Sequence, residues 1–519
     1  MHDPSSFVVP LLLLLLPFYF GGSVLYLVSR WVLRGDEGRR QRVLKSLAEA
    51  GYRSQSGDPR LVGFFHPYCN AGGGGERVLW TAISFFQRTE PDVVNVVYTG
   101  DVGVSKEKIL ANVKDRFNVA LDPRSIHFVF LKSRGLVEDS AWPMFTLLGQ
   151  SLGSMYLVWE AITQLVPDLY IDTMGYAFTF HVVRLLCHIP VGAYVHYPTI
   201  STEMLKRVRT RTAGHTNSGS ISSSKLLSSV KLLYYRLFMF CYSRSLRKAS
   251  FLMVNSTWTK NHVDAVLHHK DPLLSVFAAP LLYLLPADGQ NWELSDCSIV
   301  YPPCDTSAIV PFKLEGRSRM IVSIAQFRPE KDHPAQLRAF AALLKSYPEY
   351  RDLRHVVRLV LIGSVRNHED EARVAALRRQ ATDLGIENQI EIVVNAPFPL
   401  ALDYLSRASI GLSTMRDEHF GINVVEFMGA GVIPVVHASG GPLHDIVVPY
   451  EGGPTGELCT GYHAASEEEF ADCLHEALKL SGEAAIQMRS RARKRAVDLF
   501  SEAEFEKGWA QTCKREYYA

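Results

Sequence analysis

The sequence lacks an excess of charge of either sign. Among its 519 residues, 55 are Lys or Arg and 53 are Asp or Glu, which gives a formal net charge of +2 at pH 7. A chain with so small a net charge creates no global field for attracting nucleic acid, although local basic patches can still exist. Hydrophobic residues make up 47% and charged residues 21%, a composition typical of a folded globular protein. We therefore expect no nucleic-acid partner.

Long hydrophobic runs are also scarce, which excludes a multi-span transporter. One uncharged run, Phe7–Ser29, would span about 35 Å as a helix and could cross a bilayer. Basic residues follow it at Arg30, Arg34, Arg39, Arg40, Arg42 and Lys45. The positive-inside rule then places the N-terminus in the lumen and the body in the cytosol. We predict that residues 1–45 are a signal anchor with a basic flank. A cleaved signal peptide is the alternative, but no positive charge precedes the run and no small-residue cleavage site follows it.

Paired cysteine motifs are absent from the sequence. The eight cysteines are scattered, with no Cys-x-x-Cys spacing: Cys69, Cys187, Cys241, Cys297, Cys304, Cys459, Cys473 and Cys513. Such spacing predicts neither a zinc site nor a disulfide framework and is consistent with a body in a reducing compartment.

Short apolar runs alternate with amphipathic segments along the rest of the chain. The first group of predicted strands is Leu61–Tyr68, Val93–Gly100, Ile126–Leu131, Leu169–Thr173, Val191–His196 and Phe251–Asn255. The second group is Met320–Gln326, Val360–Gly363, Ile390–Val394, Ile410–Thr414 and Ile433–His437. This alternation predicts two doubly wound parallel sheets, whose carboxyl edges would face a cleft. We predict domains over 60–295 and 296–495, with residues 496–519 forming a helix that returns to the first domain.

Three segments interrupt this pattern. Thr210–Ser229 is rich in Ser and Gly, follows the basic group Lys206–Arg211, and is predicted to be a mobile loop. Leu226–Tyr242 is a mostly apolar helical stretch, equally consistent with a core helix or a helix on a membrane surface. Pro272–Pro286 is apolar but too short to span a bilayer, so the same two interpretations stay open there.

Two glutamates eight residues apart, Glu418 and Glu426, form the main candidate site. A predicted strand precedes them and a Gly-Ala-Gly break, Gly429–Gly431, follows. A helix that begins near Gly421 would place Glu418 in the loop before it and Glu426 in its second turn. The loop carboxylate would then accept hydrogen bonds from sugar hydroxyls, and the helical one would hold a ribose diol.

The pattern E-x-F-G-x4-E over these residues resembles the signature of retaining glycosyltransferases of family 4, which have the two-domain GT-B fold. Four further segments are similar to motifs of that family. They are the glycine-rich loop Gly72–Glu76, the strand-end pair Asn255-Ser256, the phosphate-binding Lys331 and the loop Ser439–Gly441. Several motifs in the right order make the resemblance specific, and it covers roughly residues 60–515.

Within that family, four longer segments resemble the eukaryotic α-1,2-mannosyltransferases that extend dolichol-linked oligosaccharides. They are His66–Trp80, Ile299–Asp305, Ser323–His333 and Glu418–Gly431. The resemblance implies GDP-mannose as donor and dolichol-pyrophosphate-linked Man3GlcNAc2, then Man4GlcNAc2, as acceptor. It implies the cytosolic face of the endoplasmic reticulum membrane as the location. Other glycosyltransferases of the same pathway are further expected partners.

The resemblance also implies a role for each site residue. The expected catalytic residues are Glu418, His196 and Lys331. The expected donor-binding residues are Arg328, Lys331, Glu418, Phe420, Gly421, Glu426, Gly440 and Gly441. The expected acceptor or phosphate loop comprises Gly73, Gly74, Gly75 and Glu76. The first domain would bind the acceptor and face the membrane, and the second would bind the nucleotide sugar.

The sequence departs from the family pattern at two positions. Gln326 stands at the usual arginine position, five residues before Lys331, and Arg328 is displaced from it by two residues. Asp445 replaces a glutamate that commonly follows the paired glycines. The contact of Arg328 with the donor is therefore the less secure of the two predicted cation contacts.

An Asp-x-Asp motif, the usual metal–diphosphate site, is also absent. We expect no metal or cofactor, because Lys331 and backbone N–H groups can neutralise the leaving diphosphate instead. Two alternatives stay open on the residues alone. One is a glycosyltransferase that uses another nucleotide sugar, such as a UDP-hexose, or another lipid acceptor. The other is an inactive membrane-bound scaffold, which the joint retention of Glu418, Glu426, Lys331 and His196 argues against.

Overall fold

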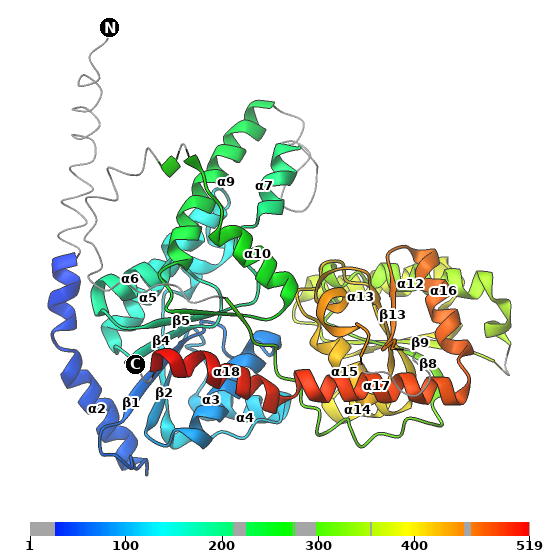
Figure 1. Cartoon of the computed structure of the whole chain (residues 1–519), viewed down its shortest axis with the longest axis horizontal. Coiled ribbons are helices and arrows are strands. Elements are labelled where there is room, and N and C mark those ends of the chain that lie inside the picture. Colours follow the sequence, from blue (N-terminus) through cyan, green and yellow to red (C-terminus); the bar gives the residue numbers. More distant parts are fainter. Residues whose placement is uncertain are drawn as a thin grey trace, which may run out of the picture.

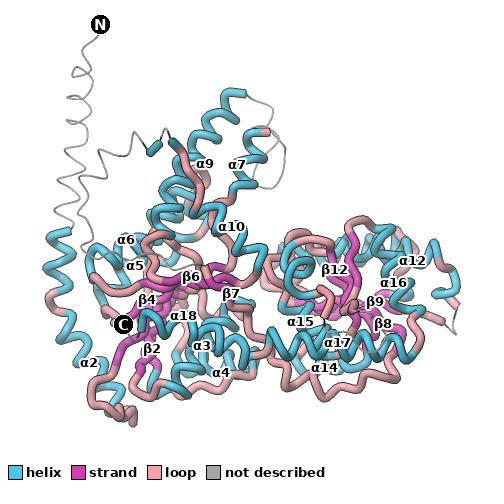
Figure 2. The backbone as a smooth tube through the Cα atoms, in the orientation of Figure 1, coloured by secondary structure: helices cyan, strands magenta, loops and turns pink. Residues whose placement is uncertain are grey.

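The computed structural model contains two parallel α/β sheets that lie side by side (Figures 1 and 2). It describes residues 26–210, 225–272, 274–275, 297–352, 355–450 and 458–517. Helices cover both faces of each sheet. The two doubly wound sheets predicted from the sequence are thus confirmed.

The first sheet has seven parallel strands in the order β3-β2-β1-β4-β5-β6-β7. Their bounds are β1 Arg60–Phe65, β2 Val93–Thr99, β3 Ile126–Phe130, β4 Leu169–Asp172, β5 Val191–Val195, β6 Phe251–Val254 and β7 Ser298–Ile299. Every residue of β2 is buried, as expected for a strand with helices on both faces.

Two helical layers enclose this sheet. The helices of one layer are α2 Asp36–Glu49, α5 Thr146–Gln164, α6 Thr179–Cys187, α7 Thr202–Arg209, α9 Lys225–Leu246 and α10 Thr257–Leu267. Those of the other are α3 Gly74–Thr89, α4 Lys106–Phe117 and the C-terminal α18 Glu502–Tyr517. Short 3-10 turns, η2 Arg134–Val137 and η3 Asp139–Ala141, lead from β3 to α5.

The second sheet has six parallel strands in the order β10-β9-β8-β11-β12-β13. Their bounds are β8 Ser318–Ile324, β9 Arg358–Gly363, β10 Ile390–Val394, β11 Ala408–Ser413, β12 Ile433–His437 and β13 Tyr462–Ala464. The helices around it are α12 His333–Ser346, α13 His368–Asp383, α14 Phe398–Arg407, α15 Ile422–Ala430, α16 Glu467–Lys479 and α17 Gly482–Phe500. The strand order reverses between β8 and β11, as it does between β1 and β4 in the first sheet. Ligands of such sheets bind beyond the carboxyl ends of the strands at these switch points.

All eleven predicted strands are present, with ends that differ by at most three residues. The edge strands β7 and β13 were not predicted. They contain two and three residues, which is too short for an apolar run to distinguish them from a loop.

The end of the chain returns to the first sheet. After α17 packs in the second domain, α18 lies against α3 and β6. Its Phe505 and Trp509 are buried in the core of the first domain, and the Trp509 ring stacks at 6.2 Å on Tyr194 of β5. The C-terminal helix therefore ties the two domains together.

A buried carboxylate makes a second connection between the domains. Asp445 lies in a short π-helical turn, Pro442–Ile446, after β12. Its side chain accepts hydrogen bonds from the Thr257 N–H (3.1 Å) and hydroxyl (2.6 Å) at the start of α10. The Tyr301 hydroxyl also donates to it, at 3.0 Å. Asp445, which departs from the family pattern, thus connects the second domain to the start of helix α10 in the first domain.

Several predicted features fall partly outside the described residues. The anchor Phe7–Ser29 lies almost wholly in residues 1–25, most of the Thr210–Ser229 loop lies in 211–224, and Pro272–Pro286 lies mostly in 273 and 276–286. Across the ranges that are described, no helix is both long enough and apolar enough to span a bilayer. The anchor stays a prediction.

The apolar stretch Leu226–Tyr242 forms most of α9, and one side of it packs as a core helix, whereas contact with a membrane stays a prediction. Tyr235, Phe238, Met239 and Tyr242 are buried in the core of the first domain. A second stripe of the same helix, which begins at Leu227, is exposed.

Substitution of Asp445 tests the buried connection. We expect Asp445→Ala to lower the free energy of unfolding by about 1–3 kcal/mol, because it leaves the partly buried donors of Thr257 and Tyr301 without their shared acceptor. Urea unfolding monitored by fluorescence would measure the change. Asp403→Ala is the matched control, since Asp403 is half exposed and its carboxylate pairs with the surface Arg407. Equal effects of the two substitutions would contradict the role of Asp445.

Candidate active site

The predicted site residues gather where the carboxyl ends of the two sheets face each other. His196 follows β5, whereas Lys331 and Glu418 follow β8 and β11. Two residues that were not predicted as site residues, His66 and Thr173, follow the neighbouring strands β1 and β4. A Cβ placed on Gly74, at the start of α3, would lie 3.0 Å from Cδ1 of Ile422. Ile422 is the first residue of α15, so two helix N-termini meet at this point. Such N-termini favour anions, because their N–H groups are unpaired within the helix.

Lys331 and Glu418 form an ion pair at the switch point of the second sheet. The Lys331 Nζ lies 2.8 and 3.0 Å from the two carboxylate oxygens of Glu418. The two side chains are only 22% and 12% exposed, so the pair is shielded from bulk water. The structure thus brings together two of the three predicted catalytic residues.

The loop that carries Glu418 is held by the paired glycines. The Gly441 N–H donates to the Glu418 carbonyl oxygen at 2.8 Å. Gly440 has φ of +63°, and a Cβ there would lie 2.2 Å from that same oxygen. No other residue type fits so close to this backbone. Ser439 adds a further contact, since its hydroxyl accepts a hydrogen bond at 2.7 Å from the Asp417 N–H. These glycines therefore position the Glu418 loop.

Glu426 lies in the second turn of α15, as predicted. Its carboxylate is half buried, and burial raises its pKa above the ordinary value of 4.5. Arg77 of α3, in the other domain, is the main charge that opposes this rise. Glu426 is thus a carboxylate at the boundary between the domains.

Arg328 occupies a partly buried position before Lys331. Its only ion pair within the described ranges is a long one, 3.8 Å to Glu330. Its buried Nε makes no hydrogen bond there either. Burial lowers the pKa of the guanidinium, and the positive charge of Arg366 lowers it further. An incompletely paired arginine beside a second arginine fits a role in anion binding.

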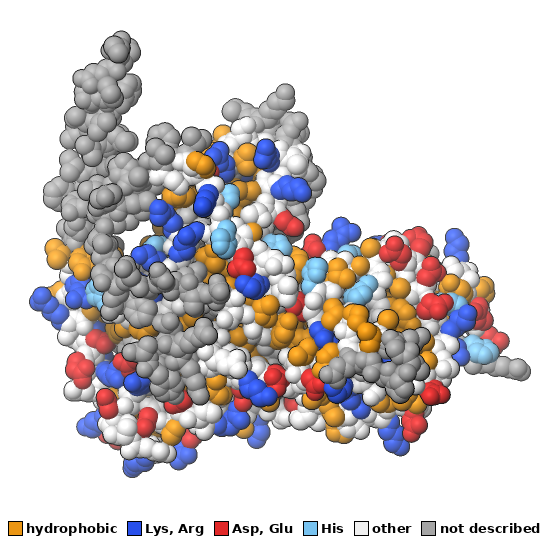
Figure 3. Space-filling model, viewed as in Figure 1, with side chains coloured by type: hydrophobic (Ala, Val, Ile, Leu, Met, Phe, Trp, Pro, Cys, Tyr) orange, Lys and Arg blue, Asp and Glu red, His pale blue; other side chains and the backbone are white. Residues whose placement is uncertain are grey.

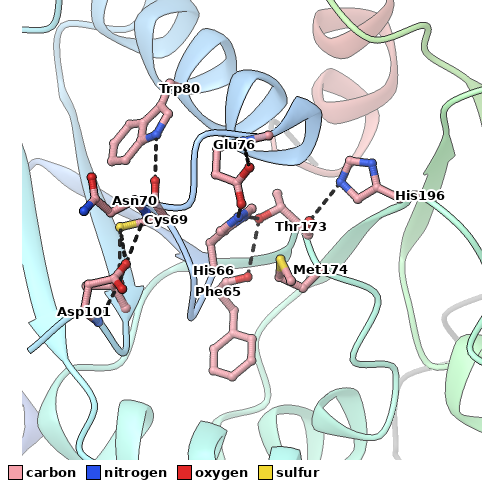
Figure 4. Close-up of polar contacts among 12 residues, drawn as sticks. Phe65, His66, Cys69, Asn70, Glu76, Trp80, Asp101, Thr173, Met174 and His196 are labelled. Atoms are coloured by element: carbon pink, nitrogen blue, oxygen red, sulfur yellow. Dashed lines mark hydrogen bonds and ion pairs between the residues drawn. The ribbon is translucent and has the colours of Figure 1, made fainter. Parts of the chain in front are cut away.

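The glycine-rich loop is fixed by a hydrogen-bond network that Figure 4 shows. One Glu76 oxygen accepts from the Gly73 N–H at 2.5 Å, and the other lies 3.5 Å from His66 Nε2. His66 Nδ1 is 2.8 Å from the Thr173 hydroxyl. Glu76 therefore serves to hold the loop, and the Gly73 N–H is already occupied. Within the predicted loop, Gly74 faces Ile422 of the second domain and Gly75 faces His196.

His196 is partly buried beside this network. Its Nε2 donates to the Thr173 carbonyl oxygen at 3.2 Å, which leaves Nδ1 as an acceptor. Burial lowers the pKa of His196 to about 4, and His66 contributes to the shift. The ring is therefore neutral at pH 7. Asn255, from the predicted strand-end pair, donates to the His196 carbonyl at 3.0 Å and so positions the residue.

The structure adds one site residue that the sequence did not predict, His419. Its ring stacks on Tyr197 at 4.4 Å and on Trp258 at 5.4 Å, both of the first domain. Because Glu418 is its neighbour, this stack sets the position of Glu418 relative to the first domain. His419 occupies the x position of the E-x-F-G motif, where the motif specifies no residue type. The motif therefore could not predict a contact of His419 with the first domain.

Phe420 takes a different place from the one that donor binding suggests. Its side chain is buried against Tyr301 and Phe500, with ring centroids 5.7 and 5.5 Å away. The aromatic ring thus anchors the loop in the core of the second domain, and only its backbone is left for a ligand. Gly421, next to it, has φ of +111° and caps α15.

Over the described part of the chain, no three His, Cys, Asp or Glu side chains are grouped closely enough to hold a metal ion.

Comparison with known proteins agrees with this geometry. Residues 59–267 match the family described as ALG11 mannosyltransferase N-terminus, and residues 308–495 match glycosyl transferases group 1. A Homo sapiens protein named GDP-Man:Man(3)GlcNAc(2)-PP-Dol alpha-1,2-mannosyltransferase is 47% identical over 451 residues, which are 86% of this chain and 85% of the relative. The chain belongs to this mannosyltransferase family. A Dictyostelium discoideum mannosyltransferase of the same name is 43% identical over 86% of this chain and 82% of its own length. The family predicted from the motifs is confirmed, and the chain is a glycosyltransferase.

Solved structures support the fold of this mannosyltransferase. Anabaena HepE, in complex with UDP and glucose, matches with a TM-score of 0.54 over 88% of this chain and 99% of its own, at 14% identity. The trehalose 6-phosphate synthase from Burkholderia multivorans matches with a TM-score of 0.60, over 88% and 98%, at 11% identity. At such low identity the likeness shows the two-domain fold alone.

Two glycines with the same backbone conformation allow a test of the Glu418 loop. Gly440 has φ of +63° and lies against Glu418, whereas Gly385 has φ of +64° and has open space where a Cβ would point. Alanine at either position should cost about 1–2 kcal/mol of stability from backbone strain, and at Gly440 the clash with the Glu418 backbone adds to this cost. Only Gly440→Ala should displace Glu418 and slow mannosyl transfer, by about 100-fold.

The measurement is the initial rate of transfer from labelled GDP-mannose, alongside thermal melting of both variants. A Gly440→Ala enzyme as fast as Gly385→Ala would show that the close approach of Gly440 does not position the site.

Proposed function

We propose that this enzyme transfers mannose in α-1,2 linkage from GDP-mannose to dolichol-pyrophosphate-linked Man3GlcNAc2 and then to the product of that first addition. The observation that carries the proposal is the shielded Lys331–Glu418 pair at the switch point of the second sheet. It lies in a chain with 47% identity to the human protein that is named for this reaction. The reaction would proceed with retention at the anomeric carbon, because an α-linked donor gives an α-linked product.

The donor diphosphate would lie beside Lys331, near the N-termini of α3 and α15. Departure of GDP places negative charge on the phosphate oxygens in the transition state. Lys331, the incompletely paired Arg328 and the helix N–H groups would stabilise that charge without reorganising. Glu418 would hold Lys331 in place before the donor binds.

The two glutamates would then divide the donor between them. Glu426, one turn into α15, would accept hydrogen bonds from the ribose hydroxyls. Glu418 would accept from hydroxyls of the mannose, on the side that faces His196. A neutral His196 is suited to accept a hydrogen bond at Nδ1 from a sugar hydroxyl. It does not serve as a proton donor, because its pKa of about 4 leaves it uncharged at cytosolic pH.

Transfer would take place on one face of the mannose. The acceptor hydroxyl forms its bond to the anomeric carbon as the bond to the diphosphate breaks, and its proton passes to the leaving phosphate oxygen. Neither a protein nucleophile nor a metal is needed, since the protein supplies the positive charge. We therefore expect an excess of EDTA to leave the rate of transfer unchanged.

The acceptor requires a membrane location. We propose the endoplasmic reticulum membrane, with residues 1–45 as the anchor, a short lumenal N-terminus and the two domains in the cytosol. Other glycosyltransferases of the same pathway would be neighbours there. The support for this placement is the uncharged run Phe7–Ser29 and the basic residues after it.

Alanine variants of three residues test the site. Lys331→Ala should lower the rate of transfer by about 10²–10³-fold, because the leaving diphosphate loses its main cation. Glu418→Ala and Glu426→Ala should each lower it strongly as well. The assay uses labelled GDP-mannose and a lipid-linked trimannosyl acceptor, and counts the mannoses added.

Lys345→Ala is the control, since Lys345 is an exposed lysine on α12. Unchanged rates in all three site variants, with native melting curves, would refute the site. Thermal stabilisation by UDP in place of GDP would instead indicate another donor.

The raised pKa of Glu426 predicts a pH dependence of donor binding. As the pH falls from neutral toward the ordinary value of 4.5, Glu426 takes up a proton earlier than an exposed glutamate does. The KM for GDP-mannose should therefore rise over this range. In Glu426→Gln it should be high already at neutral pH and change little on acidification. Glu387→Gln, at an exposed site, should keep the pH profile of the parent enzyme. A parent-like profile for Glu426→Gln would contradict the ribose contact.

A further inference from the structure

Protein atoms engage the whole ammonium group of Lys331. A lysine ammonium carries three N–H donors and no acceptor. Its Nζ lies 3.0 and 2.8 Å from the two carboxylate oxygens of Glu418 and 3.1 Å from the thioether sulfur of Met415. Three acceptors therefore match the three donors, so a diphosphate oxygen that binds Lys331 has to replace one of them.

The three acceptors differ in strength. A carboxylate makes charge-assisted hydrogen bonds with an ammonium, which are about twice as strong as hydrogen bonds between neutral groups. A thioether sulfur is only a weak acceptor. Glu418 also accepts through both of its oxygens, so its departure would remove two partners of Lys331 at once. The Met415 sulfur is therefore the acceptor that an incoming phosphate oxygen replaces.

The loop around Lys331 is held in place without the side chain of Met415. The hydroxyl of Thr414 donates to the Asp332 carbonyl oxygen at 2.9 Å. Thr414 is only 3% exposed, which protects this contact from water. The Asp332 side chain in turn accepts a hydrogen bond at 3.2 Å from the Ala335 N–H in α12. The loops after β8 and β11 are thus joined by a buried contact that does not depend on the Met415 sulfur.

Core packing does not account for the position of Met415. The residue is partly exposed, and it belongs to none of the four hydrophobic clusters that the described residues form. Its side chain is unbranched and has three rotatable bonds, so the sulfur can leave Lys331 by a change of rotamer. A weak acceptor on a flexible side chain suits a contact that is made and broken in every catalytic cycle.

The boundary between the domains carries scattered cations in place of a dense basic patch. On the face that Figure 3 shows, Lys and Arg side chains are interspersed there with apolar and histidine side chains. His419 adds no charge at neutral pH, because burial and the nearby charge of Lys331 lower its pKa to about 4. Affinity for a diphosphate therefore depends on whether Lys331 has an N–H to offer.

We propose that Met415 is a positioning residue of the donor site, whose sulfur occupies the third N–H of Lys331 and gives it up to an oxygen of the donor diphosphate. Lys331 then keeps both contacts with Glu418 and gains the phosphate, so the cation stays in place when the donor binds. The inference rests on the proposed function, since it takes the diphosphate of a nucleotide sugar as the ligand of Lys331.

Two substitutions separate this role from simple structural support of Lys331. Glutamine is about as long as methionine and carries an amide oxygen, which is a stronger acceptor, whereas leucine has a similar volume and no acceptor. If the sulfur has to give up the N–H, Met415→Gln should weaken GDP binding about tenfold and Met415→Leu only about twofold. If Met415 only supports Lys331, the order is reversed, because glutamine would hold the lysine better than leucine.

Isothermal titration calorimetry of the full-length enzyme in detergent measures the Kd for GDP. Guanosine is titrated in parallel, because it lacks the diphosphate and should bind both Met415 variants with the affinity of the parent. Met144→Gln is the matched control, since Met144 is a methionine of the first domain with 76% exposure. It should match the parent with both ligands, and thermal melting checks the fold of each variant.

A Met415→Gln enzyme that binds GDP as tightly as the parent, or more tightly than Met415→Leu does, would overturn the proposal. An equal loss of affinity for GDP and guanosine would also overturn it, because the effect would then lie outside the diphosphate contact.

A measurement on the parent enzyme does not depend on the folding of a variant. With isotope-labelled methionine methyl groups, the NMR signal of Met415 is identified by its loss in Met415→Leu. We expect this signal to shift with GDP and with inorganic pyrophosphate but not with guanosine, and an unmoved signal at saturating GDP would overturn the proposal. If the parent binds no GDP, the proposed function fails, while the pyrophosphate titration still decides whether Met415 yields Lys331 to a diphosphate.

Discussion

The ion pair between Lys331 and Glu418 is the interaction around which the site is built. It joins the loops after β8 and β11, at the point where the strand order of the second sheet reverses. A lysine held there by a carboxylate is a cation with a fixed position, which is what a leaving diphosphate requires. The paired glycines, the buried Phe420 ring and the capping Gly421 all serve to hold the Glu418 side of this pair.

The first domain completes the site through contacts that span the two sheets. The His419 stack on Tyr197 and Trp258 fixes the Glu418 loop against the strand end that carries His196. Asp445 and the returning helix α18 hold the domains together at positions away from the ion pair. The distance between the two domains is therefore set by several independent contacts, of which the aromatic stack is closest to the Lys331–Glu418 pair.

Much of the fold could be predicted from the sequence, because buried parallel strands appear as short apolar runs. The apolar runs Val93–Gly100 and Ile433–His437 predicted the strands β2 and β12 without knowledge of the tertiary structure. The edge strands β7 and β13 were missed, since two or three residues carry no periodic signal. The glutamate pair and the start of α15 near Gly421 were also predictable, because a helix start and two spaced carboxylates leave a local pattern. Lys331 was predicted only from the resemblance to the family motif.

The roles of individual residues depended on contacts between distant segments. The Phe420 ring, for example, packs against Tyr301 and Phe500 in the core of the second domain. Asp445 was noticed only as a departure from a motif, and it proved to cap a helix of the other domain. The sequence by itself determined the family, the two sheets and the set of chemical groups. Only the tertiary structure decided which groups face each other across the domains and which apolar side chains stay exposed, because those outcomes depend on contacts between segments that are distant in the sequence.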